Sequence, residues 1–370
     1  MLGSYRRALN AGWTDNDFVE LVGRLNDAVA AVDGHGFEIT PLVCQPELAA
    51  HLGLEHHLWV KDDTGNVAGS HKARHLFGTM LHLAVSAANE GELVIASCGN
   101  AALAAAVVAR AAERRLRVFI PTWANPAVVA KLEVLEATIE VKERRAGAAG
   151  DPTVAAMVDA IDRGAIPFSV QGPMTESALD GGRTLGWELA EQLALSRVRG
   201  RVEIFVQVGG GALAAATWRG LNDGIREQWL SVEPVLHTVQ TEAVAPLNRA
   251  WRLLLSETDG DPEAALEAAR HDPDAYMWPW EDVGSSAASG ILDDLTYDWL
   301  PVIEAMLTSG GEVHVFTEEM IGTVNILARD LTGIEVDATG SSGAAALLDP
   351  TVTKRVNGDA VVLFTAGTLD

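Results

Sequence analysis

Short apolar runs rich in β-branched residues alternate along the chain with segments whose apolar residues recur at helical spacing. The strand-like runs cover residues 58–63, 93–97, 117–121, 139–142, 202–208, 235–239, 312–316 and 361–364. Helical composition marks 101–114 and 178–195, and Thr14 and Asp15 form a cap before a further helical stripe. Strands separated by helices form parallel sheets covered on both faces. The pattern therefore predicts an α/β protein in which each sheet is parallel-rich and flanked by helices.

The length and composition suit a two-lobed protein, because 370 residues with 48% hydrophobic content can bury two moderate cores. We expect a smaller, mobile lobe at 80–170 and a larger cofactor-binding lobe formed by 1–79 and 171–370. Residues 249–283 read as an acidic and aromatic insertion that contains Trp278 and Trp280. This insertion is either a lid that caps the site or a solvated acidic helix whose aromatic edge packs into the core.

The charge balance excludes several classes of partner. With 27 basic against 51 acidic side chains, the formal charge is -24, which repels nucleic acid and anionic membranes. The sequence shows no signal peptide and no membrane-spanning run. Cys44 and Cys98 form neither a disulfide framework nor a zinc motif, and we expect no metal site. We therefore predict a cytoplasmic protein.

A lysine follows the first strand-like run on a turn of small residues. Lys72 lies in the segment Val67–Arg74, after residues 58–63. A lysine removed from water is a nucleophile toward an aldehyde, with which it forms an imine. Alone, the segment also fits an exposed loop, so its interpretation depends on the motifs that follow.

A glycine run after residues 202–208 predicts an anion-binding loop. The run and the helical pattern that it opens comprise Gly209, Gly210, Gly211, Ala212 and Leu213. Unhindered N–H groups at a helix N-terminus bind phosphate. The spacing matches neither the dinucleotide nor the P-loop motif, which disfavours a nucleotide-dependent dehydrogenase. Close packing of helix on strand is the structural alternative.

Two other strand ends carry candidate binding groups. The first is a strand-to-helix junction predicted to hold a substrate carboxylate, formed by Ser97, Cys98, Gly99, Asn100 and Ala101. The Asn100 amide can also hydrogen-bond a ring hydroxyl. The second is Thr365, whose hydroxyl at the end of the last strand can face a pyridine nitrogen. Together the four motifs suit a phosphorylated aromatic aldehyde.

These motifs resemble, in order and spacing, those of the tryptophan synthase β-subunit-like, fold type II family of pyridoxal-phosphate enzymes. The matching segments are 39–42, 61–63, 69–74, 97–100, 180–184, 209–213, 289–291, 336–343 and 365–367. The resemblance implies pyridoxal 5'-phosphate as cofactor, Lys72 as the Schiff-base lysine and Asn100 as the partner of the cofactor hydroxyl. It further implies residues 209–213 as the phosphate cup, Thr365 as the ring-nitrogen partner, and a homodimer.

The implied reaction starts with removal of the α-proton of an amino acid by the freed Lys72. Elimination of a β-substituent gives an ammonia-lyase similar to serine and threonine dehydratases, which the glycine loop favours. A β-replacement synthase similar to cysteine synthase, tryptophan synthase β or threonine synthase is the alternative, and His71 resembles the tryptophan synthase pattern. Ser97 is a catalytic candidate as the opposite-face acid of a racemase. A binding protein without turnover is the alternative of another class.

Overall fold

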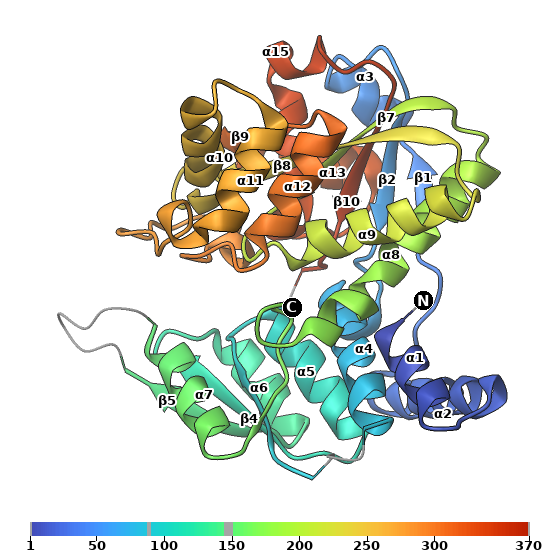
Figure 1. The fold of residues 1–370 in the computed structure, drawn as a ribbon, viewed down its shortest axis with the longest axis vertical. Coiled ribbons are helices and arrows are strands. Elements are labelled where there is room, and N and C mark those ends of the chain that lie inside the picture. The colour runs from blue at the N-terminus through green and yellow to red at the C-terminus, as the bar shows by residue number, and fades with distance from the viewer. Residues whose placement is uncertain (1, 87–89, 144–150, 369–370) are drawn as a thin grey trace. The chain divides into compact units, whose positions relative to one another are not determined.

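The chain forms two compact units, as the computed structural model shows for residues 2–86, 90–143 and 151–368 (Figure 1). Unit 1 holds the residues up to Ile39 together with Asn66–Gly182. Unit 2 holds Thr40–Gly65 and Arg183–Thr368. The α8 helix (Glu176–Leu195) begins in unit 1 and ends in unit 2.

Unit 1 is built on a parallel sheet in which the described strands follow the order β5-β4-β3-β6. Its strands are β3 (Leu93–Ala96), β4 (Leu116–Pro121), β5 (Thr138–Lys142) and β6 (Ile166–Pro167). Its helical elements are α1 (Gly3–Asn10), α2 (Asp15–Asp33), η1 (Val67–Gly69), α4 (Lys72–Ala84), α5 (Asn100–Ala111), α6 (Pro126–Val134) and α7 (Pro152–Asp162). The predicted cap at Thr14 is confirmed, since its side chain accepts from the Asp17 N–H at the start of α2.

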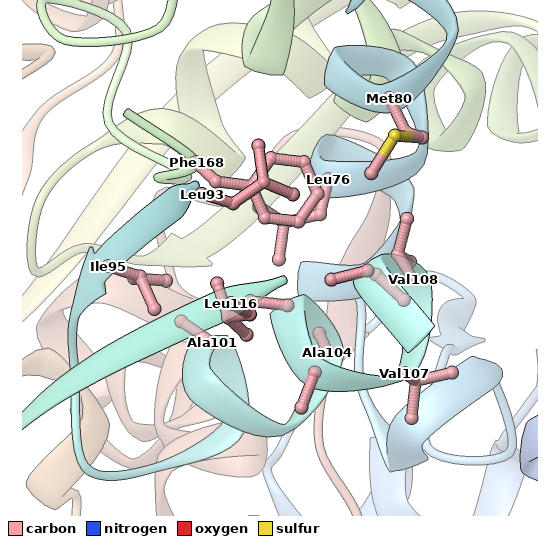
Figure 2. Packing of buried hydrophobic residues seen from close by; sticks show 14 of the residues in the cluster. Leu76, Met80, Leu93, Ile95, Ala101, Ala104, Val107, Val108, Leu116 and Phe168 are labelled. Atoms are coloured by element: carbon pink, nitrogen blue, oxygen red, sulfur yellow. The ribbon is translucent and has the colours of Figure 1, made fainter. Parts of the chain in front are cut away.

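One hydrophobic core joins the N-terminal helices to this sheet. Figure 2 shows side chains of α4, β3, α5 and β4 in one hydrophobic cluster with Phe168. Phe18, Leu25 and Val29 of α2 are buried in the same core, and α2 packs against α5. The described residues of 2–39, 66–79 and 171–182 therefore belong with those of 80–170 in unit 1, whereas the sequence pattern assigns 1–79 and 171–370 to the larger lobe. Helical periodicity identifies a buried face but not the core that receives it.

Unit 2 contains a larger sheet whose described strands follow the order β1-β2-β10-β7-β8-β9. They are β1 (Leu42–Cys44), β2 (Leu58–Asp62), β7 (Gly200–Gln207), β8 (Val232–Thr241), β9 (Val313–Phe316) and β10 (Asp359–Phe364). All pairings are parallel except that of the edge strand β1, which runs antiparallel to β2. The predicted α/β class with parallel-rich sheets is confirmed in both units.

Helices cover both faces of the unit 2 sheet. The α9 helix packs against β7 and β8 and α12 packs against β8, while η4 packs against β7 to β10. The helical elements are α3 (Pro46–His51), α9 (Ala212–Arg226), α10 (Pro246–Glu257), α11 (Pro262–His271), η2 (Pro273–Ala275), η3 (Ser289–Ile291), α12 (Trp299–Ser309), α13 (Glu318–Thr332), α14 (Ala338–Ser341), η4 (Ser342–Leu348) and α15 (Pro350–Thr353). Within the described part of the chain, no helix is long and apolar enough to cross a membrane.

Candidate functional site

The sequence-predicted site residues fall into two groups, one in each unit. Unit 1 carries Lys72 and the junction 97–101, and unit 2 carries the glycine loop 209–213 and Thr365. In both units these residues follow the carboxyl ends of parallel strands or begin helices. Such edges gather helix N-termini and are the usual location of ligand sites in α/β proteins.

The turn before Lys72 is tight and strained. The Asn66 side chain accepts from the Val67 N–H, and Ala68 and Gly69 both adopt positive φ, 55° and 67°. A positive φ at alanine costs on the order of 1 kcal/mol, and such strain concentrates at functional sites. The Ala68 N–H donates to Asp33 Oδ2 at 3.0 Å, which ties the turn to the end of α2. Lys72 then opens α4 with a half-buried side chain.

The helix that carries Lys72 is held by a close crossing with α8. A Cβ on Gly78 would lie 2.4 Å from the Gly181 Cα, and one on Gly181 would lie 2.1 Å from the Arg74 carbonyl oxygen. Only glycine permits this approach. Beside the crossing, His75 Nδ1 lies 2.9 Å from the Ala178 carbonyl oxygen, so this nitrogen carries the proton and donates. These contacts fix the direction of α4.

The junction 97–101 connects β3 to α5. The Ser97 hydroxyl accepts from the Gly99 N–H at 3.5 Å, and Gly99 caps the helix in a conformation with φ -138° and ψ -145°. The N–H groups of Asn100 and Ala101 donate to no described residue, and the first turn of α5 has no acidic side chain. This helix end is therefore suited to an anion such as a carboxylate. Burial raises the pKa of the Cys98 thiol, which disfavours a thiolate here.

Unit 1 also contains buried polar atoms that have no partner among the described residues. They belong to Ser70, Asn100, Arg117, Gln171 and Thr175. A buried polar atom without a partner is costly and indicates a ligand, ion or water that completes it. Gln171 and Thr175 were not identified from the sequence, although polar residues directly after β6 were an available signal. Phe168 N–H donates to the Val94 carbonyl, which sets this segment beside β3.

The glycine loop of unit 2 joins β7 to α9. Gly211 caps α9 with φ 93°, a conformation that favours glycine. The N–H groups of Gly209, Gly210, Gly211 and Ala212 donate to no described residue, and the first turn of α9 has no acidic side chain. Four N–H groups without a described acceptor at a helix N-terminus suit the anion-binding loop that the sequence predicts.

A second segment of unit 2 packs on this loop and explains why glycine is needed. A Cβ on Gly209 would lie 2.4 Å from Asp293 Oδ2 and 2.8 Å from the Ile291 Cα. The Asp298 N–H donates to the Gly210 carbonyl at 2.8 Å, and the Thr296 methyl would lie 3.1 Å from a Cβ on Gly211. The segment 291–298 therefore packs on the loop and restrains it. Sequence analysis identified the motif 289–291 but not the rest of this segment.

Thr365 ends β10 and is buried, with 1% of its surface exposed. Gln207, the last residue of β7, donates from Nε2 to Thr365 Oγ1 at 2.7 Å. The neighbouring backbone is also fixed, because the Asp337 N–H donates to the Ala366 carbonyl at 3.0 Å. Burial raises the pKa of Asp337 to about 6. Gln207 lies two residues before the glycine loop, so its side chain links this part of unit 2 to the Thr365 hydroxyl.

The aromatic residues of the insertion surround an arginine. The Arg249 guanidinium of α10 lies 3.8 Å from the centre of the Trp278 ring and 5.1 Å from that of Trp280. Trp278 Nε1 donates to Glu281 at 2.9 Å, and the Trp280 N–H donates to the Asp294 carbonyl at 2.8 Å. The insertion therefore joins the segment that packs on the glycine loop, and its role as a lid stays a prediction.

The family follows from comparison with known proteins. The sequence model of the family described as "Pyridoxal-phosphate dependent enzyme" matches residues 35–367. The chain belongs to this pyridoxal-phosphate dependent family. The resemblance identified from the motifs is therefore confirmed, and so is pyridoxal phosphate as the cofactor of the family.

Several solved structures share the fold at low identity. Maize serine racemase is 16% identical with a TM-score of 0.68, and the match covers 94% of each chain. The threonine deaminase of T.th. is 20% identical with a TM-score of 0.69, covering 94% of this chain and 98% of that one. Diaminopropionate ammonia lyase from Escherichia coli is 15% identical with a TM-score of 0.69, covering 96% and 89%. No curated protein sequence matches the chain.

The residues of each unit fit the family's cofactor. The unpaired N–H groups at the glycine loop suit its phosphate. The buried Asn100 Oδ1, which has no partner among the described residues, suits its ring hydroxyl, and the Thr365 hydroxyl suits its ring nitrogen. Lys72, at the start of a helix fixed by a glycine crossing, carries an amine that suits its aldehyde. No described group of His, Cys, Asp and Glu side chains could hold a metal ion.

Proposed function

We propose that this protein is a pyridoxal-phosphate dependent lyase that removes a β-substituent from an amino acid and releases ammonia and a 2-oxo acid. The chemistry of serine and threonine dehydratases is the nearest description. The proposal rests on family membership and on the residues of the two units. Lys72, the glycine loop and Thr365 are the residues proposed to serve the cofactor.

When bound, pyridoxal phosphate withdraws electrons from the α-carbon of an amino acid and so makes its α-proton removable. Lys72 is proposed to hold the cofactor and then to accept that proton. The N–H groups of Asn100 and Ala101 and the Ser97 hydroxyl are proposed to orient the substrate carboxylate, which places the α-proton toward the lysine. The glycine loop holds phosphate and does not take part in proton transfer.

The observation that carries the choice of elimination is the neutral hydroxyl of Thr365 at the end of β10. A hydroxyl does not protonate a pyridine nitrogen, so electron withdrawal at the α-carbon stays moderate. Negative charge that builds at this carbon is then relieved by departure of a β-substituent. Release of the product, instead of attack by a second substrate, depends on how the site excludes water and nucleophiles.

The test is an assay of the purified holoenzyme with L-serine, L-threonine and O-activated L-serines, measuring ammonia and 2-oxo acid. We expect both products in equal amounts from at least one of these, and none from the Lys72→Ala variant. Adding a thiol or indole in the same assay detects the β-replacement synthase, because a new amino acid then forms in place of oxo acid. Conversion of L-serine to D-serine without oxo acid would contradict elimination and identify a racemase. The cytoplasmic location and the homodimer stay predictions.

A further inference from the structure

Gln207 connects the two cofactor-binding features of unit 2. It is the last residue of β7, two positions before the glycine loop, and only 3% of its surface is exposed. Its side chain reaches across to the end of β10, the strand hydrogen-bonded to β7 in the sheet. A buried amide at this position is costly unless its hydrogen bonds are made.

The orientation of the Gln207 amide follows from its neighbours. Nε2 lies 2.9 Å from the Gly340 carbonyl oxygen and 3.4 Å from the Leu363 carbonyl oxygen. Carbonyl oxygens only accept hydrogen bonds, so the nitrogen and not the oxygen must face them. The third neighbour of the same nitrogen is Thr365 Oγ1 at 2.7 Å. Oε1, in contrast, is buried without a partner among the described residues.

This orientation decides how the Thr365 hydroxyl is used. Since Gln207 donates, Oγ1 accepts, and one of its lone pairs is occupied. Thr365 is the acceptor in this hydrogen bond, so its bond to Gln207 does not use its own hydroxyl hydrogen. A pyridine nitrogen without a proton can accept a hydrogen bond, whereas a protonated pyridine would compete with Gln207 as a second donor.

The space for the amide is created by glycines of the segment 336–343. A Cβ on Gly343 would lie 2.7 Å from Gln207 Oε1 and 3.0 Å from the Phe205 carbonyl oxygen. A Cβ on Gly340 would lie 2.8 Å from the Ala366 nitrogen. The motif that matched the family around 336–343 therefore packs directly around Gln207 and the residue after Thr365. This packing leaves the amide little freedom to turn.

We propose that Gln207 is a positioning residue that makes the Thr365 hydroxyl a hydrogen-bond donor toward the ring nitrogen of the cofactor and so keeps that nitrogen unprotonated. The inference rests on the proposed role of Thr365 in the proposed function. Gln207 itself does not touch the reacting atoms. It acts by donating the hydrogen bond that Thr365 Oγ1 accepts.

The test compares Gln207→Met, which removes the donor, with Gln207→Glu, whose carboxylate turns the site into an acceptor and draws the Thr365 hydrogen toward itself. The readout is the pH midpoint of the cofactor absorbance band in the holoenzyme without substrate. A bond donated to the ring nitrogen lowers the basicity of the rest of the cofactor, so its loss raises the midpoint. We expect a rise of at least about half a pH unit in Gln207→Met, the size of one hydrogen bond, and more in Gln207→Glu.

The second readout is a double-mutant comparison in a Thr365→Ala background. If Gln207 acts through the Thr365 hydroxyl, replacing Gln207 shifts the midpoint no further in that background. We also expect kcat to fall by about ten- to a hundredfold in Gln207→Met with KM little changed, as when a partner behind a site residue is lost. Equal shifts with and without the Thr365 hydroxyl, or no shift in either Gln207 variant, would overturn the proposal.

A matched control separates this effect from a general loss of packing. Gln240 of β8 is fully buried, donates to the Val208 carbonyl at 3.2 Å and accepts from the Asn248 N–H at 3.0 Å. We expect Gln240→Met to lower stability to a similar extent and to leave the midpoint unchanged. The titration needs no turnover. A shift confined to the Gln207 variants therefore supports the inference even if the lyase assay fails, and its absence in an active lyase refutes this inference alone.

Discussion

The predicted site residues of unit 1 and those of unit 2 differ in which of their polar groups already have a described partner. Both groups include a helix start with unpaired N–H groups, at Asn100 in unit 1 and at Gly211 in unit 2. In unit 1 the adjacent side chains of Ser70 and Asn100 keep buried atoms without a described partner. In unit 2 the Thr365 hydroxyl already accepts a hydrogen bond from Gln207. In unit 1, therefore, a ligand must supply the missing hydrogen-bond partners of these side chains. Unit 2 contributes backbone donors and an oriented hydroxyl.

This difference suggests that the two groups of residues serve different parts of the ligand. Fixed backbone donors and pre-oriented groups suit a part of the ligand that stays in place, because they need no rearrangement when it binds. Side chains that lack partners suit groups that change during turnover, such as the substrate and the atoms near the reacting centre. Variants at the glycine loop of unit 2 should therefore weaken cofactor binding, and variants of the predicted site residues in unit 1 should reduce turnover.

The largest expected effect is that of Lys72→Ala in unit 1. We expect kcat to fall by about a thousandfold or more, because both the covalent link and the proposed base are lost. The cofactor should still bind through the unit 2 groups, with a cofactor absorbance band that no longer depends on a lysine. Absorbance spectra, equilibrium dialysis with pyridoxal phosphate and the ammonia assay measure the three quantities. Retained turnover would show that another residue removes the α-proton.

The next effect is that of Gly209→Ala in unit 2. The added Cβ would lie 2.8 Å from the Ile291 Cα, a backbone atom, so the loop must shift. We expect cofactor affinity to fall by about ten- to a hundredfold, measured as a dissociation constant for the apoprotein.

Gly322→Ala in α13 is the matched control, because nothing lies within 4 Å of its added Cβ. Alanine in an open helical position should stabilise unit 2 by about 0.5 to 1 kcal/mol and leave cofactor affinity unchanged. Equal losses of affinity in the two variants would mean that the glycine loop is not the binding feature.

These residues also show how far the sequence could predict the site. Lys72, residues 97–101, the glycine loop and Thr365 could be proposed as site residues because each follows a strand-like run and has a chemistry that its position explains. Gln207 could not be identified, because its role depends on the pairing of β7 with β10, strands that are far apart in the sequence. Asp293 and Thr296 were missed for the same reason, since no local pattern shows that their segment packs on the loop.

The fold was predictable to a similar degree. The strand-like runs became strands, and their separation by helices indicated parallel sheets, because hydrophobic periodicity is a local property. The division into units was not local. Residues 1–39 join unit 1 because the buried face of α2 meets α5, and periodicity does not specify which helix a buried face meets. The short edge strand β1 has too few residues for a recognisable alternation.

A smaller effect concerns the stability of unit 2 without cofactor, which we expect to depend on pH through His314. Burial, and then repulsion by His237, lowers the pKa of His314 to about 4, while Glu312, Asp349 and Arg355 are the other charges that act on it. The unfolded chain takes up a proton near pH 6.5 and the folded chain does not, so stability falls as the pH drops from about 6.5 toward 4.

We expect the free energy of unfolding to fall by about 1–2 kcal/mol between pH 7 and pH 5 from this group, a loss that His314→Phe should remove. Urea denaturation of the apoprotein at both pH values measures the difference. Asp337 works in the opposite direction, because its pKa is raised to about 6 and its protonation favours the folded state as the pH falls. Parallel pH profiles of wild type and variant would assign the pH dependence to groups other than His314.

The smallest effect on stability, and the one that separates the two units most directly, is that of Asn100→Ala. The Asn100 side chain opens α5 with a buried Oδ1 that lacks a described partner, so its removal relieves a desolvation cost in the apoprotein. We expect the free energy of unfolding of the apoprotein to stay the same or to rise by up to about 1 kcal/mol, while turnover falls by about three- to tenfold. A stabilised protein with lower turnover is the signature of a residue kept for its ligand. If the variant instead loses stability and keeps its turnover, Asn100 serves the fold and not a ligand.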